Sequence, residues 1–323
     1  MKITATLSVF AALCLFGNNH NQGATTQRGD KVPVTMPYKL VSDWPQLPAG
    51  WTLGQGSGIA TDGRDRVYAL HRGRNPAMVL DPRGKLLHHW GDRMFCWPHG
   101  IRVDPDGNVW ITDGGTGWWP TPDSIPGKGH VVLKFNAEGK LLMTLGKQGE
   151  PGEDPEHFNG PSDLAFTPNG DFYVTDGYGN SRVVKFSRSG KYILAWGKKG
   201  SAEGEFNLPH AIAIDSRGLV YVADRENLRV QIFDADGKFI NQWKHVGRPI
   251  GLALGSDGHF YVADANGQKI LRVSAEGKIL GEFGTKGNDP GQLGGVHHIA
   301  AGPAGALYLA ELSTNRFQKF VPR

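Results

Sequence analysis

Apolar and polar positions alternate in short runs along most of the chain, and turns rich in glycine and aspartate separate the runs. The segment 208–243 shows this arrangement most completely, with four alternating runs joined by turns. Alternation with a period of two residues, broken by turns every eight to twelve residues, is typical of short antiparallel strands. This segment therefore predicts one four-stranded antiparallel sheet.

Six copies of this unit follow one another along the chain. In each copy an apolar residue is followed, twelve positions later, by an acid or a substitute for it. The six pairs are Ile59 and His71, Ile101 and Asp113, Leu164 and Asp176, Ile212 and Asp224, Leu252 and Asp264, and Ile299 and Glu311. A single four-stranded sheet cannot bury both of its faces, so repeated sheets of this kind pack radially around an axis. The predicted fold is all-β, a six-bladed β-propeller that forms a single domain over residues 38–323.

The two ends of the repeat region complement each other. Residues 38–44 resemble the outermost strand of a blade, whereas the last copy stops at Phe320 without such a strand. We therefore expect the N-terminal strand to complete the last blade and close the ring. Closure removes an open sheet edge that would otherwise pair with other chains.

The chain begins with a lysine and an apolar run that is short for a membrane span, which is typical of a secretory signal peptide. We expect a signal peptide over residues 1–24, a flexible leader over 25–37, and a secreted or periplasmic monomer without a transmembrane segment. A lipid anchor on Cys14 is the less favoured alternative. Beyond that segment Cys96 is the one cysteine, which leaves no internal disulfide. The net charge of +4 is spread over scattered basic residues, which argues against nucleic-acid binding.

When the six copies are aligned, one position carries histidine in every second copy, and this alternation indicates a metal site. Two positions before the apolar residue of each pair, the copies carry Ser57, His99, Ser162, His210, Ile250 and His297. The first strand of a propeller blade lines the central channel, so histidines in alternate blades point at one spot on the axis. Three neutral imidazoles with an open fourth position are typical of catalytic zinc, although imidazoles alone do not exclude copper, iron or manganese. The alternative is that a repeated Pro-His turn keeps its histidine for packing.

Two arginines and a tyrosine occupy a second column, just after the acid of each pair. Arg72 and Arg225 stand there in blades one and four, and Tyr178 lies in the corresponding loop of blade three. If these loops lie at the channel mouth, the two guanidinium groups face the metal and clamp a carboxylate. Taken singly, each residue is better explained as part of a structural ion pair or as a loop anchor. The insertion that contains Trp118 and Trp119 either covers the channel mouth or packs on a neighbouring blade.

Several longer segments resemble one enzyme family. They include PHGIRVDPDGNVWITD, DGYGNSRVVKFS, LPHAIAI and VADRENLRVQIF, and they extend over the repeat region. The chain resembles the peptidyl-α-hydroxyglycine α-amidating lyases, which are propellers built from NHL-like repeats. The resemblance implies a zinc-dependent carbon–nitrogen lyase that cleaves an N-acyl- or peptidyl-α-hydroxyglycine to an amide and glyoxylate. It also implies zinc ligands at His99, His210 and His297, with Tyr178 as the base. Arg72 and Arg225 would bind substrate and stabilise charge.

The chain departs from that family at a second metal position. The resemblance implies a structural calcium ion held by the backbone carbonyls of Ile59 and Ile101 and by an acid near the last histidine. This chain has His298 in place of that acid, and an imidazole is a poor ligand for a cation that prefers oxygen. The sequence therefore leaves calcium open. The family's disulfide is also absent, because Gly179 stands in the tyrosine loop.

Two other functions stay open. A metal-dependent propeller hydrolase of the lactonase type is one, although such enzymes usually hold calcium through inward carboxylates rather than histidines. A non-enzymatic NHL-repeat binding module of the cell envelope is the other. Such a module would not need Tyr178 together with three converging histidines.

Overall fold

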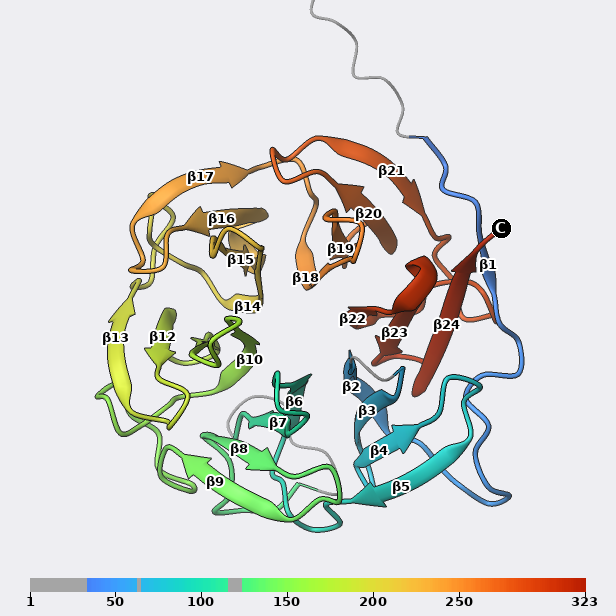
Figure 1. Ribbon diagram of the computed structural model, residues 1–323, viewed down its shortest axis with the longest axis horizontal. Helices are drawn as coiled ribbons and strands as arrows, with labels where there is room; N and C mark the ends of the chain where they lie inside the picture. The colour runs from blue at the N-terminus through green and yellow to red at the C-terminus, as the bar shows by residue number, and fades with distance from the viewer. Residues whose placement is uncertain (1–33, 63–64, 116–123) are drawn as a thin grey trace, which may run out of the picture. The chain divides into compact units, whose positions relative to one another are not determined.

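The computed structural model describes residues 34–62, 65–115 and 124–323, and over these residues the chain forms six four-stranded antiparallel sheets around one axis. Figure 1 looks down this axis, with the first strand of each sheet innermost. The prediction of an all-β, six-bladed propeller is confirmed. Within blades one to five each strand pairs with the next one along the chain, whereas blade six also contains β1, which pairs with β24.

The blades have the following strands. Blade one comprises β2 (Gln55–Thr61), β3 (Val67–Arg72), β4 (Ala77–Leu80) and β5 (Leu86–Trp90), and blade two comprises β6 (Pro98–Val103), β7 (Val109–Asp113), β8 (Val131–Phe135) and β9 (Leu141–Leu145). Blade three comprises β10 (Pro161–Phe166), β11 (Phe172–Asp176), β12 (Arg182–Phe186) and β13 (Tyr192–Trp196), and blade four comprises β14 (Pro209–Ile214), β15 (Val220–Asp224), β16 (Arg229–Phe233) and β17 (Phe239–Trp243). Blade five comprises β18 (Pro249–Leu254), β19 (Phe260–Asp264), β20 (Lys269–Val273) and β21 (Ile279–Phe283). Blade six comprises β22 (Val296–Ala301), β23 (Leu307–Glu311) and β24 (Arg316–Pro322) together with β1 (Tyr38–Leu40), and short 3-10 turns η1 (Arg225–Asn227) and η2 (Pro303–Gly305) lie in blades four and six.

Apolar side chains fill the spaces between neighbouring blades. Between blades four and five, for example, Tyr221 packs on Phe260 with ring centroids 4.2 Å apart, and Trp243 lies 5.2 Å from the same ring. All three residues are buried. Because both faces of each sheet are covered in this way, middle strands such as β15 are buried at every position, whereas outer strands such as β13 stay partly exposed. The core of the molecule is therefore a ring of inter-blade contacts.

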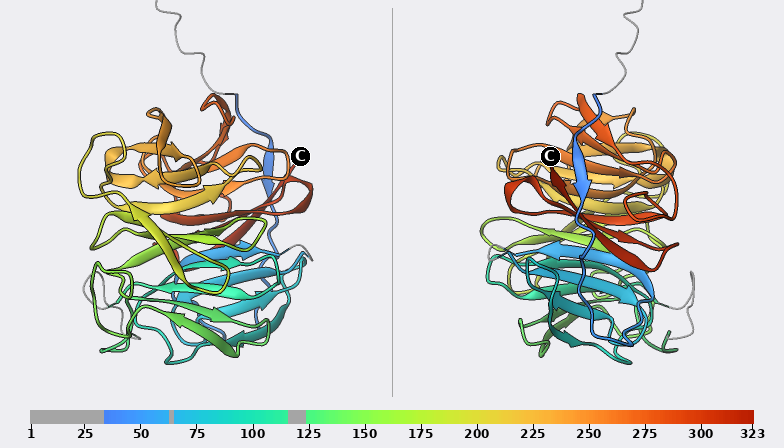
Figure 2. Two further views of the ribbon diagram at one scale, coloured as in Figure 1. Left: turned by 60° about the vertical axis from the view of Figure 1, so that its left-hand side comes forward. Right: turned by 90° about the vertical axis from the view of Figure 1, so that its right-hand side faces the viewer.

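The N-terminal strand closes the ring as expected. Strand β1 pairs antiparallel with β24, with Tyr38 opposite Pro322 and Leu40 opposite Phe320. Figure 2 shows this N-terminal segment, in blue, running along the outside of the last blade. The Tyr38 ring also stacks on Phe283 of blade five at a centroid distance of 4.6 Å. One short strand thus links blades five and six.

The end of the predicted leader is bound to the propeller. Met36 N donates a hydrogen bond to the Glu282 carbonyl at 2.8 Å, and Glu282 N donates to the carbonyl of Val34 at 2.9 Å. A flexible leader was expected through residue 37, but these last residues lie beside β21 because its outer edge offers free backbone groups. The predicted signal peptide, Cys14, Trp118 and Trp119 lie outside the described residues. Within the described part of the chain, no helix is long and apolar enough to cross a membrane.

Candidate metal site

A β-bulge aims each axial side chain. The register between the first and second strands shifts between Pro98 and Ile101 in blade two, between Pro209 and Ala211 in blade four, and on either side of His297 in blade six. An extra residue in one strand bends it and redirects a side chain. His99, His210 and His297 lie within these shifts, so the bulges turn their imidazoles toward the axis.

The three histidines converge on one point. One ring nitrogen of each lies within 4.8 Å of the corresponding nitrogens of the other two. The ring centroids are 4.7 Å apart for His99 and His210, 4.6 Å for His99 and His297, and 4.9 Å for His210 and His297. All three residues are at most 1 % exposed. This nearly regular triangle of buried imidazoles could hold a metal ion.

Backbone carbonyls of the intervening blades orient the imidazoles. His99 Nδ1 donates to the Ser162 carbonyl at 2.7 Å, His210 Nδ1 to that of Ile250 at 2.6 Å, and His297 Nδ1 to that of Ser57 at 2.7 Å. The three acceptors are the non-histidine members of the same sequence column. Because a carbonyl can only accept, each Nδ1 carries the proton and each Nε2 keeps a lone pair. A hydrogen bond of this kind fixes the tautomer of metal-binding histidines.

The electrostatic environment keeps these imidazoles neutral. Burial is the largest cause, and it lowers the pKa of all three well below the usual value for histidine. The charge of Arg72 lowers the pKa of His99 and His297 further, and Arg225 does the same for His210. A neutral imidazole is the form that binds metal. The donors, their tautomer and their protonation state therefore fit a divalent transition metal.

Tyr178 lies directly beside this triangle. Its hydroxyl oxygen is 3.0 Å from Nε2 of His99 and 3.1 Å from Nε2 of His210. The backbone N–H of Tyr178 donates to the Gly160 carbonyl at 3.1 Å, which holds the loop after β11 against the turn before β10. Burial raises the pKa of the Tyr178 phenol, while the charges of Arg225 and Arg72 lower it in part. The arginines act in the expected direction, but burial outweighs them.

The two arginines of the second column reach the site from different sides. Arg225 Nη1 donates to the Tyr178 hydroxyl at 3.3 Å, and Arg225 Nε donates to Glu226 Oε1 at 2.8 Å. Arg72 lies over the Trp97 ring, 4.2 Å from its centroid, and Arg72 Nε donates to the Pro98 carbonyl at 3.2 Å. Burial lowers the pKa of Arg72 to about 10, so it remains charged at neutral pH. Two cationic groups therefore flank the triangle.

The acids of the repeat pairs anchor loops instead of facing the metal. Asp113 accepts the backbone N–H groups of Cys96 and Trp97 at 2.8 and 2.6 Å, and Asp224 accepts that of Asn207 at 2.7 Å. In blade one, where His71 replaces the acid, its Nδ1 accepts the N–H of Gly54 at 3.1 Å. This position therefore fixes the turn that leads into the first strand of each of these blades.

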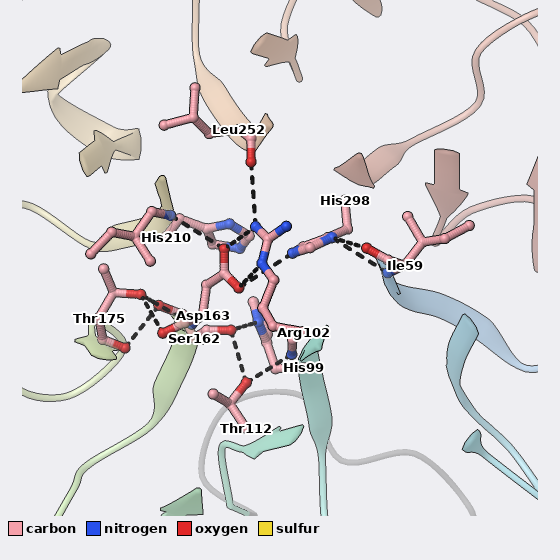
Figure 3. A network of polar contacts seen from close by, with 12 residues as sticks. Ile59, His99, Arg102, Thr112, Ser162, Asp163, Thr175, His210, Leu252 and His298 are labelled. Carbon is pink, nitrogen blue, oxygen red and sulfur yellow. Dashed lines mark hydrogen bonds and ion pairs between the residues drawn. The ribbon is translucent and has the colours of Figure 1, made fainter. Parts of the chain in front are cut away.

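The residues at the expected calcium position do not fit a calcium ion. Figure 3 shows that the Arg102 guanidinium occupies this part of the axis, beside Asp163 and His298. Arg102 binds both carboxylate oxygens of Asp163, and His298 Nδ1 lies 3.1 Å from the carbonyl oxygen and 3.4 Å from the backbone N of Ile59. The Asp163 carboxylate is therefore already paired with a cation, and an imidazole stands where the resemblance places an acidic ligand. Among the described residues, the donors at this level do not fit the calcium ion suggested by the resemblance, with Ile59 and Ile101 as carbonyl ligands.

Two residues of the site were not found from the sequence. Trp97 contacts the Tyr178 ring edge-on at 4.8 Å and also supports Arg72, while Glu226 pairs with both Arg225 and Arg248. Each lies next in the chain to a predicted residue, Trp97 before the Pro-His motif and Glu226 after Arg225. Their position next to predicted residues was the one available sign. A comparison of the repeats could not show them, because neither residue type recurs at this position in the other blades.

Comparison with known proteins agrees with the fold and with the suspected family. The NHL repeat model matches residues 95–118, 158–186 and 206–233. The chain thus carries NHL repeats on a propeller fold. It is similar to proteins named peptidyl-α-hydroxyglycine α-amidating lyase, and the resemblance seen in the sequence is confirmed.

Three relatives define the extent of this similarity. Peptidyl-α-hydroxyglycine α-amidating lyase 1 of Drosophila melanogaster is 36% identical over 56% of this chain and 34% of its own length. Peptidyl-glycine α-amidating monooxygenase B of Xenopus laevis is 35% identical over 63% of this chain and 25% of its own length. NHL repeat-containing protein 3 of Homo sapiens is 34% identical over 64% of this chain and 60% of its own length. The chain thus spans about a quarter of the Xenopus relative and more than half of the human one.

Solved structures share the fold at lower identity. A streptogramin B lyase superposes with a TM-score of 0.61 at 17% identity, covering 89% of this chain and 98% of the other. A gluconolactonase from Xanthomonas campestris superposes with a TM-score of 0.62 at 13% identity, covering 91% and 98%. Because lyases and a lactonase share this propeller, the fold alone does not decide the reaction.

Proposed function

We propose that this chain is a zinc-dependent lyase that cleaves an N-acyl- or peptidyl-α-hydroxyglycine into an amide and glyoxylate. The observation that supports this most strongly is the Tyr178 hydroxyl, 3.0 and 3.1 Å from the Nε2 atoms of two of three converging, neutral histidines. A base at this distance from a metal site can reach a hydroxyl group bound there. The relatives named as lyases support the same reaction class.

His99, His210 and His297 would hold the zinc ion through Nε2. A bound zinc ion supplies Lewis-acid chemistry, because a hydroxyl group in contact with it becomes far more acidic. The histidines themselves bind and orient, since their Nδ1 protons are committed to backbone carbonyls. Four-coordinate zinc with three protein ligands keeps one position for substrate.

The protein groups then move one proton. The Tyr178 phenolate oxygen takes the proton of the substrate hydroxyl, and the carbon–oxygen bond becomes the carbonyl of glyoxylate. The C–N bond breaks, its electron pair goes to the amide nitrogen, and that nitrogen takes back one proton. One hydroxyglycine thus gives one amide and one glyoxylate without oxidation or reduction. Arg225, 3.3 Å from the Tyr178 hydroxyl, favours the phenolate form that this step needs.

The substrate carboxylate would face the arginines. Arg72 and Arg225 lie on two sides of the triangle, and a guanidinium can bind a carboxylate with two parallel hydrogen bonds. The carboxylate that becomes part of glyoxylate is therefore held while the amide leaves. This arrangement favours substrates with a free α-carboxylate over esters or lactones.

The test is glyoxylate release from α-hydroxyhippurate, a simple N-acyl-α-hydroxyglycine. We expect activity in the purified protein, loss of activity after chelation, and recovery when zinc is added back. His210→Ala should abolish both activity and stoichiometric zinc binding. The control is His245→Ala, because His245 lies away from the axis, with Nε2 donating to the Gly277 carbonyl.

Other outcomes would point to the alternatives. A protein that binds one zinc ion but releases no glyoxylate would contradict the lyase proposal and keep the metal site. Hydrolysis of lactones by that zinc-bound protein would favour the hydrolase. Absence of both zinc binding and glyoxylate release would favour a binding module.

A further inference from the structure

The axial channel contains a second layer of polar residues, next to the histidine layer and formed by the same six strands (Figure 3). At its centre Arg102 Nε and Nη2 donate to the two oxygens of Asp163 at 3.0 and 2.6 Å. The Asp163 side chain is fully buried and that of Arg102 is 16% exposed. A bidentate pair of this kind is geometrically specific, and it is strong where water is excluded.

Every blade contributes to this layer. Arg102 of blade two also donates to the Leu252 carbonyl of blade five at 3.3 Å, and Asp163 of blade three accepts the N–H of Ile212 of blade four at 3.2 Å. His298 of blade six lies with Nε2 at 3.5 Å from Asp163 Oδ1, and its Nδ1 is 3.1 Å from the carbonyl oxygen and 3.4 Å from the backbone N of Ile59 in blade one. The residues of this axial network are Ile59, Arg102, Asp163, Ile212, Leu252 and His298, one from each blade.

The axial network is coupled directly to the histidine layer. His298 follows His297 in the chain, and Asp163 follows Ser162, whose carbonyl orients His99. Any movement of these strands at the level of the axial network would therefore shift ligand imidazoles. Interactions that orient metal ligands commonly change metal affinity when they are removed.

The axial network also lies at the bottom of an opening. A cavity of about 720 Å³ is lined by Arg102, Ile212 and Leu252, among others, and none of the three ligand histidines is part of its described lining. The Arg102–Asp163 pair therefore stands between the histidines and this cavity. A propeller axis tends to leave a central channel, and here a fixed cation and its carboxylate fill it.

We propose that Arg102 is a built-in axial cation, which with Asp163 and His298 joins the six inner strands and positions the metal-binding histidines, so that no divalent cation is needed at this level. The guanidinium provides the positive charge that a bound hard cation would provide, and it binds the Asp163 carboxylate and the Leu252 carbonyl. Unlike a bound ion, it cannot dissociate or be chelated. The positioning role rests on the proposed function, in which the three histidines bind a metal. The proposal that the axis needs no calcium does not depend on it.

Calcium independence is tested first, on the wild-type chain. We expect the same Tm in calcium and in a calcium chelator, and no calcium that remains with the protein after dialysis against that chelator. The Kd for Co²⁺, used as a spectroscopic probe of the histidine site, should also be the same in both buffers. A rise in Tm on adding calcium, or retained calcium, would overturn the proposal.

The positioning role is tested with Arg102→Met, which removes the cation but keeps much of the side-chain volume. Because a buried carboxylate would lose its partner, we expect a fall in Tm on the order of 10 °C. Co²⁺ binding should weaken by roughly 10- to 100-fold, since the strands that carry the ligands lose their common contact. Neither the Tm nor the Kd for Co²⁺ depends on glyoxylate release, so failure of the lyase reaction would not affect the result.

The matched control is Lys134→Met. Lys134 forms an ion pair of similar burial with Asp104, at 3.1 Å, away from the axial network. We expect Lys134→Met to lower Tm without changing the Kd for Co²⁺. An equal change of Kd in both variants, or no change in Arg102→Met, would reject the positioning role. If Arg102→Met does not fold, Arg102→Lys takes its place, and a Co²⁺ affinity equal to wild type in that variant would overturn the proposal.

Discussion

Among the described residues, the Tyr178 hydroxyl lies beside the axial histidines and is able to exchange a proton. Each of the three histidines has its Nδ1 proton committed to a backbone carbonyl, so none of them can act as base through that atom. Arg225 contacts the Tyr178 hydroxyl as a donor, and a guanidinium group has no acceptor with which to take a proton. The base in the proposed reaction is therefore expected to be Tyr178.

Replacement of Tyr178 by phenylalanine tests this role. The ring contact with Trp97 at 4.8 Å should persist, so we expect Tyr178→Phe to fold and to bind one zinc ion. Its kcat for glyoxylate release should fall by roughly 10²- to 10⁴-fold, as for loss of a general base. Tyr173→Phe is the control, because Tyr173 lies on β11 of the same blade and donates to the Ala235 carbonyl, remote from the histidines. Wild-type kcat in Tyr178→Phe would exclude it as the base.

His71 should make folding stability depend on pH. Burial lowers its pKa to about 4, while in the unfolded chain it titrates near 6.5, so the unfolded state binds the proton first. Its contribution to stability is therefore complete above about pH 6.5 and is lost as the pH falls toward 4. In His71→Asn the amide oxygen can still accept the Gly54 N–H. The loss of unfolding free energy between pH 6.5 and 4 should then be smaller by up to about 3 kcal/mol.

Chemical denaturation at several pH values measures this difference. The three axial histidines also have lowered pKa values, but they are present in both proteins and cancel in the comparison. His88→Asn, on the exposed face of β5, is the control and should reproduce the wild-type pH dependence. Equal pH dependence in His71→Asn and wild type would show that His71 is not buried neutral.

The residues that sequence could indicate are those that recur at one position of the repeat. The histidine column was visible because His99, His210 and His297 share a position and alternate with other residues. Arg102 and Asp163 form a single pair but stand at different positions of their own blades, one after and one before the apolar residue. Nothing in a repeat alignment connects them, because their contact joins the first strands of two neighbouring blades and depends on the bulged register of those strands.

At the scale of elements, the loop after β11 determines where Tyr178 lies. Gly177 in this loop approaches β14 so closely that a Cβ atom would collide with the Pro209 carbonyl oxygen. A Cβ atom at Gly179 would meet the side-chain amide of Asn159, so a larger residue at position 179 requires that side chain to move. The absence of the family's cysteine from position 179 thus agrees with the local packing.

Gly177→Ala should therefore displace the tyrosine loop. We expect a loss of roughly 1–3 kcal/mol of stability, as for overpacking, together with a reduced kcat because Tyr178 moves away from the histidines. Gly218→Ala is the control: Gly218 has φ +81° in a turn, and a Cβ there meets no atom within 4 Å. It should cost stability through backbone strain alone and leave kcat unchanged. Unchanged activity in Gly177→Ala would mean that the loop position does not limit catalysis.

The strands were predictable from the alternation of apolar and polar residues. The β-bulges were not predictable from that pattern. The twelve-residue spacing of the pairs, as in Ile212 and Asp224, is the same in every blade. It contains no sign of the register shift between Pro209 and Ala211. That shift depends on the backbone geometry of two paired strands, and the hydrophobic pattern of one strand does not record it.

At the scale of the whole molecule, closure of the ring depends on three residues at the N-terminal end of the propeller. Strand β1, Tyr38–Leu40, supplies the outer strand of blade six, and the Tyr38 hydroxyl donates to the Gly305 carbonyl at 3.0 Å. The sequence indicated this closure because the last repeat lacked one strand. It did not indicate the attachment to blade five, where Met36 and Glu282 form backbone hydrogen bonds that any residue types could make.

Removal of β1 should open the ring. A chain that begins at residue 42 lacks the partner of β24 and the ring stack between Tyr38 and Phe283, so a whole strand edge and an apolar surface become exposed. Compared with a chain that begins at residue 34, we expect a Tm lower by on the order of 10 °C and association into oligomers through the free edge. Scanning calorimetry and size-exclusion chromatography measure the two effects.

The axial network lies at the opposite edge of blade six, on β22, so Co²⁺ affinity below the unfolding temperature should stay close to that of the longer chain. A shortened chain with the same Tm and a monomeric profile would show that the inner strands and their axial contacts hold the ring together without closure by β1.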